Sequence, residues 1–253
     1  MSALSPAVSR PVTLGRLTVV ELRKLADTRA GLWLLIVIVL ATAGTSVLQL
    51  GWADESEQSF PAFFLFGQVP SAVLLPVLGI LSVTSEWSQR TVLGTFTLVP
   101  ARGRVLGAKV VAGVLISVAA TALAAILAAV ATVIAGPLGG AASWRLEPSL
   151  IGQSLLLQAV FVLMGIGFGT LLLSTPLAIV VFFALPTVWS VLGSVVKSLS
   201  TASEWLDLNF TSQALTNPDM TGGEWSRLAV SATVWVVIPL VAGVVRVLRQ
   251  EVS

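Results

Sequence analysis

Residues 106–135, LGAKVVAGVLISVAATALAAILAAVATVIA, contain a single charged side chain, that of Lys109, near the start of the stretch. A helix needs only about 20 predominantly apolar residues to cross the hydrocarbon core of a bilayer, which is ~30 Å thick. The stretch exceeds that length and therefore predicts a transmembrane helix. It also sets the scale for recognising further spans in the chain.

Five other stretches are shorter but also approach or exceed the length needed for a span, and they carry no charged residues. The composition agrees with a membrane protein, because 56% of the 253 residues are hydrophobic and 10% are charged, whereas about 25% of the residues of a soluble domain are charged. We predict an all-α, polytopic protein with one membrane domain over residues 1–253 and no soluble domain. The predicted spans are 32–50, 62–84, 106–135, 150–173, 176–195 and 228–245.

The basic residues are divided unequally between the two sides of the predicted bundle. Six crossings place both termini on one side, and that side carries 11 of the 14 basic residues, leaving Arg145, Lys197 and Arg227 on the other. Because Lys and Arg are enriched in cytoplasmic loops, we predict a multi-pass protein of the cell membrane with both termini in the cytoplasm. The 11 residues are Arg10, Arg16, Arg23, Lys24, Arg29, Arg90, Arg102, Arg104, Lys109, Arg246 and Arg249.

Residues 14–29 precede the first span and predict an amphipathic helix in the membrane interface. Glu21 falls on the apolar arc and needs a partner, which is either Lys24 one turn later or a basic residue from the next cytoplasmic loop. A solvated anchor beside the membrane is the alternative role for this helix. The apolar arc consists of Leu14, Leu17, Leu22 and Leu25, and Arg16, Arg23 and Asp27 lie opposite.

The polar segment SEWSQRTVLGTFTLVPARGRVLGAKV, residues 85–110, joins the second and third predicted spans. Glu86 and Arg90 have the spacing of a helical i,i+4 ion pair, which predicts a short helix over about 86–98. Arg102, Arg104 and Lys109 then cluster where the chain enters the membrane again, an arrangement suited to anionic headgroups or to a docking protein. A purely topogenic role for these charges is the alternative.

Two segments resemble the membrane subunits of ABC type-2 exporters, in particular their short six-span permeases. VVELRKLADTRAGLW, residues 19–33, is similar to the Glu-x-x-Lys interfacial helix and the Thr-Arg start of the first span in that family. TSEWSQRTVLGTFTLVPARGRVLGAKV, residues 84–110, is similar to the acidic start, central Thr, Pro-x-Arg-x-Arg turn and Lys of the family's first cytoplasmic loop. Residues 87–92 follow the family only loosely.

The resemblance implies that the interfacial helix and the coupling segment, residues 86–104, form the surface on which an ATP-binding cassette subunit docks. The chain has no GxxxxGK[ST] phosphate-binding loop, so we expect it to bind no cofactor and to have no ATPase site, with ATP and Mg on the partner ATPase. The resemblance also implies a pair of permeases, which we expect to be a homodimer, with a heterodimer as the alternative. The docking positions are Glu21, Lys24, Glu86, Arg90, Thr95, Arg102 and Arg104.

Other classes of function fit the sequence less well. A carrier driven by protons or sodium ions normally keeps ionisable groups near the midplane, and the middles of the six predicted spans have none. The chain has no His and no Cys, which argues against a metalloprotease or a thiol enzyme. An enzyme that uses loop carboxylates such as Asp207 and Asp219 stays open, as does a membrane scaffold or sensor without transport. Nothing indicates a nucleic-acid partner.

Polar residues are few inside the predicted bundle. Gln68, Gln158 and Thr121 are the candidate residues of a substrate pathway, although such side chains more commonly hydrogen-bond between membrane helices. The apolar lining favours export of an apolar or amphipathic substrate from the cytoplasm. The external segment, residues 196–227, is amphipathic, and the resemblance implies short helices there that dip toward the membrane near the exit of the pathway.

Overall fold

The structure is a computed structural model that describes residues 12–88, 102–145 and 147–249. These residues form helices and no strand, which confirms the all-helical prediction. Six helices are long and apolar enough to cross a membrane, as predicted. Five predicted spans lie inside these helices, and the predicted span 150–173 passes the end of its helix by one residue. The six helices are Arg29–Trp52, Phe60–Ser88, Arg102–Leu138, Pro148–Leu172, Thr175–Val195 and Gly222–Arg249.

Shorter elements join and interrupt these spans. The α-helices are α1 Leu14–Asp27, α2 Arg29–Trp52, α3 Phe60–Gly67, α4 Val69–Ser88, α6 Arg102–Ala135, α7 Pro148–Leu172, α8 Thr175–Val195, α9 Ser200–Leu206, α10 Leu208–Gln213, α11 Gly222–Ala232 and α12 Ile238–Arg249. Single 3₁₀ turns are η1 Glu55–Glu57, η2 Gly136–Leu138, η3 Lys197–Leu199 and η4 Ala214–Thr216, and η5 Thr233–Val237 is a π-helical turn.

The second span is divided in two at Gln68. Helix α3 ends at Gly67, and α4 begins at Val69, so that Pro70 stands in the first turn of α4. A proline is tolerated there because the amides of the first turn have no partner within the helix. The second span is therefore broken two residues before Pro70.

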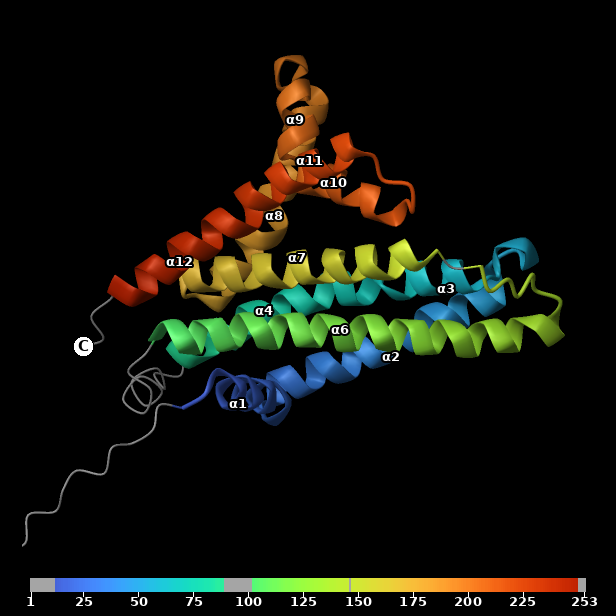
Figure 1. Ribbon diagram of the computed structural model, residues 1–253, viewed down its shortest axis with the longest axis horizontal. Coiled ribbons are helices and arrows are strands. Elements are labelled where there is room, and N and C mark those ends of the chain that lie inside the picture. Colours follow the sequence, from blue (N-terminus) through green and yellow to red (C-terminus); the bar gives the residue numbers. More distant parts are fainter. Residues whose placement is uncertain (1–11, 89–101, 146, 250–253) are drawn as a thin grey trace, which may run out of the picture.

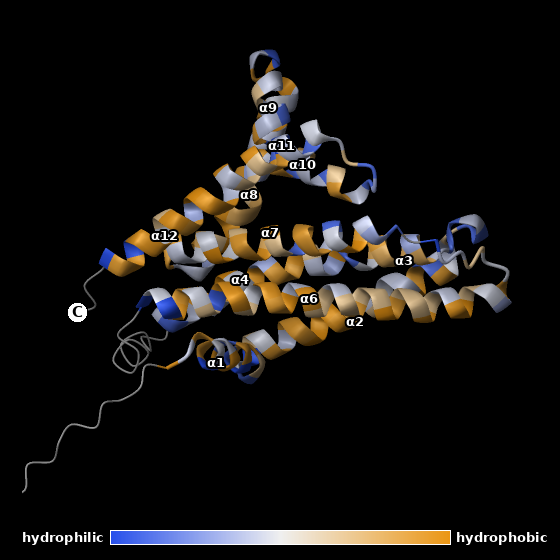
Figure 2. Ribbon diagram, viewed as in Figure 1, coloured by the Kyte–Doolittle hydropathy of each residue, from blue (hydrophilic) through white to orange (hydrophobic). Residues whose placement is uncertain are grey.

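Helices α2, α4, α6 and α7 run side by side along the long axis of the molecule, and α12 packs on α7 (Figure 1). The last described residues of α12 lie at the same end of this bundle as α1 and the start of α6. The long helices are mostly hydrophobic, and hydrophilic residues gather toward their ends (Figure 2).

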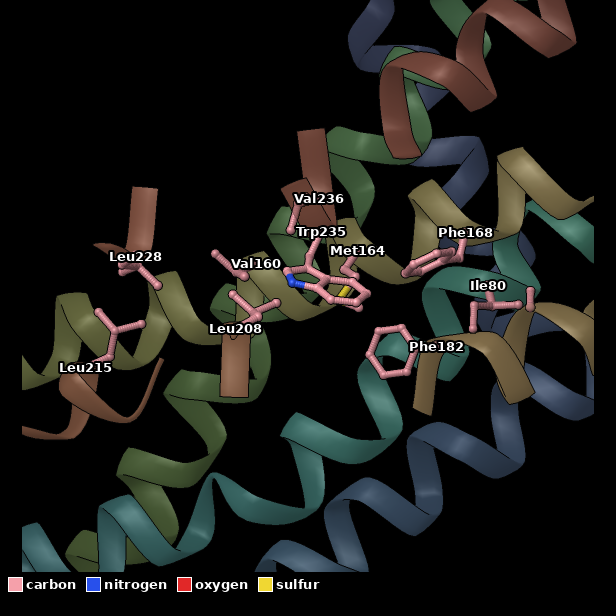
Figure 3. Packing of buried hydrophobic residues seen from close by; sticks show 11 residues of the cluster. Ile80, Val160, Met164, Phe168, Phe182, Leu208, Leu215, Leu228, Trp235 and Val236 are labelled. Carbon is pink, nitrogen blue, oxygen red and sulfur yellow. The ribbon is translucent and has the colours of Figure 1, made fainter. Parts of the chain in front are cut away.

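Segment 196–227 forms the short helices α9 and α10 and the start of α11, so short helices are present where the resemblance implies them. A buried cluster joins this segment to α7, α8 and the last span, with Met164, Phe182 and Trp235 gathered at its centre (Figure 3). The Trp235 indole also donates a hydrogen bond of 2.6 Å to the carbonyl oxygen of Leu206. The last span is therefore fixed to the segment that precedes it by both apolar and polar contacts.

The close packing of α4 on α7 depends on glycine. A β-carbon at Gly165 would lie 2.3 Å from the carbonyl oxygen of Pro76, and one at Gly169 would lie 3.2 Å from that of Ile80. The Gly165/Gly169 pair is the GxxxG spacing of the sequence, which lets backbones approach closely in membrane helices.

Replacing Gly165 with Ala should therefore force α4 and α7 apart. We expect Gly165→Ala to lower the free energy of unfolding by about 1–3 kcal/mol, because an overpacked core must move backbone atoms. Thermal unfolding in detergent measures the effect. Gly152→Ala is the matched control on the same helix, since nothing lies within 4 Å of its β-carbon position. Equal unfolding temperatures for Gly165→Ala and the unchanged protein would contradict the packing argument.

Candidate functional site: an ion network at the α1 end of the bundle

Four charged side chains from α1, α4 and α6 form one connected network. The Lys109 ammonium lies 2.6 Å from Glu21 Oε2 and 2.9 Å from Glu86 Oε1. The Lys24 ammonium lies 2.8 Å from Glu21 Oε1 and 2.8 Å from Glu86 Oε1. Each lysine therefore bridges the same two carboxylates. We call Glu21, Lys24, Glu86 and Lys109 the ion network.

Lys109 is the buried centre of the ion network, with a side chain that is 3% exposed. Its ammonium also donates a hydrogen bond of 2.6 Å to the carbonyl oxygen of Ser82, so each of its three protons has an acceptor. Burying an unpaired ammonium would cost several kcal/mol. Two carboxylates and one carbonyl around Lys109 offset that penalty.

Glu21 reaches Lys109 because of the helical periodicity of α1. Leu17, Thr18, Glu21 and Leu25 share the buried face of this helix, while Arg23 is exposed. The helix is capped by Thr13, whose hydroxyl accepts from the Arg16 amide. The buried face packs on α6 and α2 and brings the Glu21 carboxylate to the network.

Lys24 is the outermost member of the ion network, with a side chain that is 38% exposed. Burial alone would lower the pKa of Lys24, but the hydrogen bonds and charges of Glu21 and Glu86 outweigh burial and raise its pKa above the ordinary value. Lys24 therefore stays charged at neutral pH. Two ammonium groups then balance two carboxylates, so the network as a whole is neutral.

The structure brings three of the predicted docking residues, Glu21, Lys24 and Glu86, into contact with one another. The expectation that Glu21 pairs with Lys24 or with a basic residue from the next loop is confirmed, because it pairs with Lys24 and with Lys109. Lys109 was expected to lie with Arg102 and Arg104, and the structure places it inside the bundle instead. The signal for its role was present in the sequence: Lys109 is the lone charge of its span, and Glu21 is an acid stranded on an apolar face.

Of the predicted coupling segment, residues 86–104, only the two ends are described. Residues 86–88 are the last turn of α4 and continue the second span, and Arg102 and Arg104 belong to the first turn of α6. Arg90 and Thr95 lie outside the described residues. Arg104 is exposed, whereas the Arg102 guanidinium donates to the carbonyl oxygen of Val247 at 3.2 Å.

Two arginines donate hydrogen bonds to carbonyl oxygens at the ends of helices. Helix α7 ends at Leu172 and is followed by its C-cap residue Leu173, which adopts a left-handed conformation with a φ of 54°. The Arg246 guanidinium donates to the carbonyl oxygen of Leu171, one of the last carbonyls of α7, and Arg102 does the same for α12. Cations at carbonyl-bearing helix ends are favourable because they oppose the helix dipole. The ends of α7 and α12 and the start of α6 are thus tied together.

The candidate pathway residues are buried in the middle of the bundle. The Gln158 amide donates to Gln68 Oε1 at 2.9 Å and to the Gln68 carbonyl at 3.1 Å, which joins α7 to the break between α3 and α4. The structure does not bring Thr121 into this pair, and its hydroxyl has no partner among the described residues. Of the loop carboxylates, Asp207 caps α10 by accepting from the amides of Asn209 and Phe210.

In the described part of the chain, no group of three or more His, Cys, Asp and Glu side chains is arranged so that it could hold a metal ion. No model of a known protein family matches the chain, and no curated protein is similar to it at a significant level.

Removing the Lys109 ammonium should destabilise the protein strongly. We expect Lys109→Met to lower the free energy of unfolding by about 3–5 kcal/mol, because two carboxylates then share one ammonium in a buried site. A Glu21→Gln/Lys109→Met double variant should recover part of this loss, since the charges balance again. Chemical unfolding in detergent micelles measures both. Arg104→Met is the control on the exposed side of α6, and a Lys109→Met variant as stable as this control would refute the network's structural role.

Proposed function

We propose that the chain is the membrane-spanning permease subunit of an ATP-driven exporter of the ABC type-2 class, with ATP hydrolysed by a separate ATP-binding cassette subunit. One observation carries the proposal. The two segments that resemble the docking regions of this class, residues 19–33 and 84–110, are far apart in the sequence and meet through the ion network. Such a junction is what a permease needs at the place where an ATPase pushes on it.

Within the proposed docking surface, the residues of the ion network and the exposed residues outside it have different roles. Glu21, Lys24 and Glu86 hold α1 against α4 and α6, so a force applied to α1 reaches two spans through charge-assisted hydrogen bonds. Exposed residues at the α1 end of the bundle, which include Arg23 and Arg104, then make the contacts with the ATPase. Arg90 and Thr95 keep their proposed role as contacts of the coupling segment.

The remaining parts of the proposal follow from the spans. Helix α1 lies in the membrane interface on the cytoplasmic side, both termini are cytoplasmic, and two copies of the permease assemble with two ATPases. The substrate is apolar or amphipathic, because the spans lack ionisable residues at their middles and leave neutral groups such as Gln68, Gln158 and Thr121 as the polar contacts.

The orientation can be tested directly because the chain has no cysteine. The connection between α2 and α3 and the start of α6 lie at opposite ends of the bundle (Figure 1). Glu55 belongs to the first of these segments and Arg104 to the second, and both are exposed and suited to replacement by single cysteines. In intact cells, an impermeant thiol reagent should label the Glu55→Cys variant and leave the Arg104→Cys variant unlabelled. Permeabilised cells give the control in which both react. Labelling of Arg104→Cys in intact cells would reverse the proposed orientation.

The transport role is tested by the partner. Affinity purification from native membranes should recover an ATP-binding cassette chain, and ATP hydrolysis should appear in that complex and be absent from the isolated permease. Arg104→Glu should weaken recovery of the ATPase without changing the unfolding temperature, because the side chain is exposed and lies outside the ion network. ATP hydrolysis by the isolated chain, or purification without any ATP-binding partner, would instead favour the scaffold or sensor alternative.

A further inference from the structure

A cleft with a volume of about 620 Å³ opens beside the ion network. It lies between α1, the start of α2 and the end of α4. Its walls include Lys24, Leu25, Arg29, Gly31, Leu81 and Ser85. The proposed function makes no use of this space.

The turn between α1 and α2 creates the cleft. Thr28 has an extended conformation between the two helices, with φ −80° and ψ 138°, and its hydroxyl caps α2 by accepting from the Gly31 amide. A β-carbon at residue 31 would lie 2.0 Å from the carbonyl oxygen of Leu25, so only glycine permits this close turn. Helix α1 is thereby folded back from α2 and leaves a space toward α4.

At the cleft, the negative side chains are largely buried and the positive side chains are more exposed. The carboxylates of Glu21 and Glu86 have side chains that are 7% and 12% exposed, and both are bound by Lys109, whereas the Lys24 side chain is 38% exposed. Arg29 is exposed, and its side chain has no hydrogen bond or ion pair within the described chain. The cleft itself is lined by two cations, Lys24 and Arg29, and by the two carboxylates. Lys109 does not line the cleft, but it binds both carboxylates from inside the bundle, so that the five groups together carry one positive charge in excess.

The depth of the cleft matches that of lipid headgroups. Arg29 is the first residue of the first membrane-spanning helix, and Glu86 lies in the last turn of the second, so the cleft is placed where hydrocarbon meets water. Its walls carry apolar side chains from Leu25, Ala30 and Leu81 beside the two cations. A ligand that fits both walls has an anionic head and an apolar chain.

We propose that this cleft binds an anionic phospholipid, with the phosphate at Lys24 and Arg29 and an acyl chain along Leu25 and Leu81. Basic pockets between membrane helices on the cytoplasmic side are known sites for anionic headgroups. The proposal depends on the membrane location of the chain and not on the ATPase. It therefore stands or falls independently of the exporter function.

The test compares lipids on the full chain in detergent. Native mass spectrometry and thermal unfolding should show that phosphatidylglycerol binds and raises the unfolding temperature, whereas phosphatidylcholine at the same concentration does neither. Inorganic phosphate should give no protection, because it lacks the acyl chain. Protection by inorganic phosphate equal to that by phosphatidylglycerol would assign the cleft to a free anion and overturn the lipid proposal.

Matched variants locate the binding. Arg29→Gln should weaken phosphatidylglycerol binding roughly tenfold, the effect of losing one charge-assisted hydrogen bond, while Arg23→Gln removes the same charge from the exposed side of α1 and should have no effect. Ser85→Trp leaves every charge in place and fills the cleft, and it should abolish binding with unchanged helix content. Equal weakening by Arg23→Gln and Arg29→Gln, or full binding by Ser85→Trp, would refute the site.

Discussion

The buried ammonium of Lys109 is the contact on which the α1 end of the molecule depends. Its three hydrogen bonds join α6 directly to α1 and α4, in addition to the apolar packing between these helices. A buried ion network contributes little net stability, because desolvation offsets the attraction, but losing one member leaves an uncompensated charge. Its effect is to fix where α1 lies. An apolar contact between the same helices would allow α1 to slide or rotate, whereas an ammonium with three acceptors does not.

Neutralisation inside the network also determines what this end of the bundle presents to its surroundings. Because Glu21 and Glu86 are matched by Lys24 and Lys109, the charges left exposed around α1 are mainly those of arginines. The ion network thus positions α1, whereas the proposed contacts with lipid and with the ATPase are made by other residues of the same short segments. Arg29 is exposed at the start of α2, beside the proposed lipid site, and Arg104 is exposed at the start of α6, where we propose contact with the ATPase.

Hydropathy sufficed to predict the six spans, since length and apolar content are properties of a window of residues. It did not locate the break at Gln68, because a turn of one residue barely changes a window average. The partner of Glu21 was predictable because a carboxylate on an apolar helical face requires a cation. The inward position of Lys109 was missed because Lys109 was grouped with Arg102 and Arg104 as one basic cluster, whereas the five residues from Arg104 to Lys109 correspond to a rotation of about 140° around the helix. Lys109 therefore faces inward although Arg104, its neighbour in the basic cluster, faces out.

The same contacts suggest which parts of the bundle move together. Helices α4 and α7 approach so closely at Gly165 and Gly169 that they form one unit, and the ion network attaches α1 and the start of α6 to that unit. At the far end of α4, the helix is interrupted at Gln68, where the Gln158 amide of α7 holds the broken turn. A displacement of α1 is therefore expected to move α4 and α7 as a rigid pair. The backbone at Gln68 is then the place where α3 can keep its position while α4 changes its own.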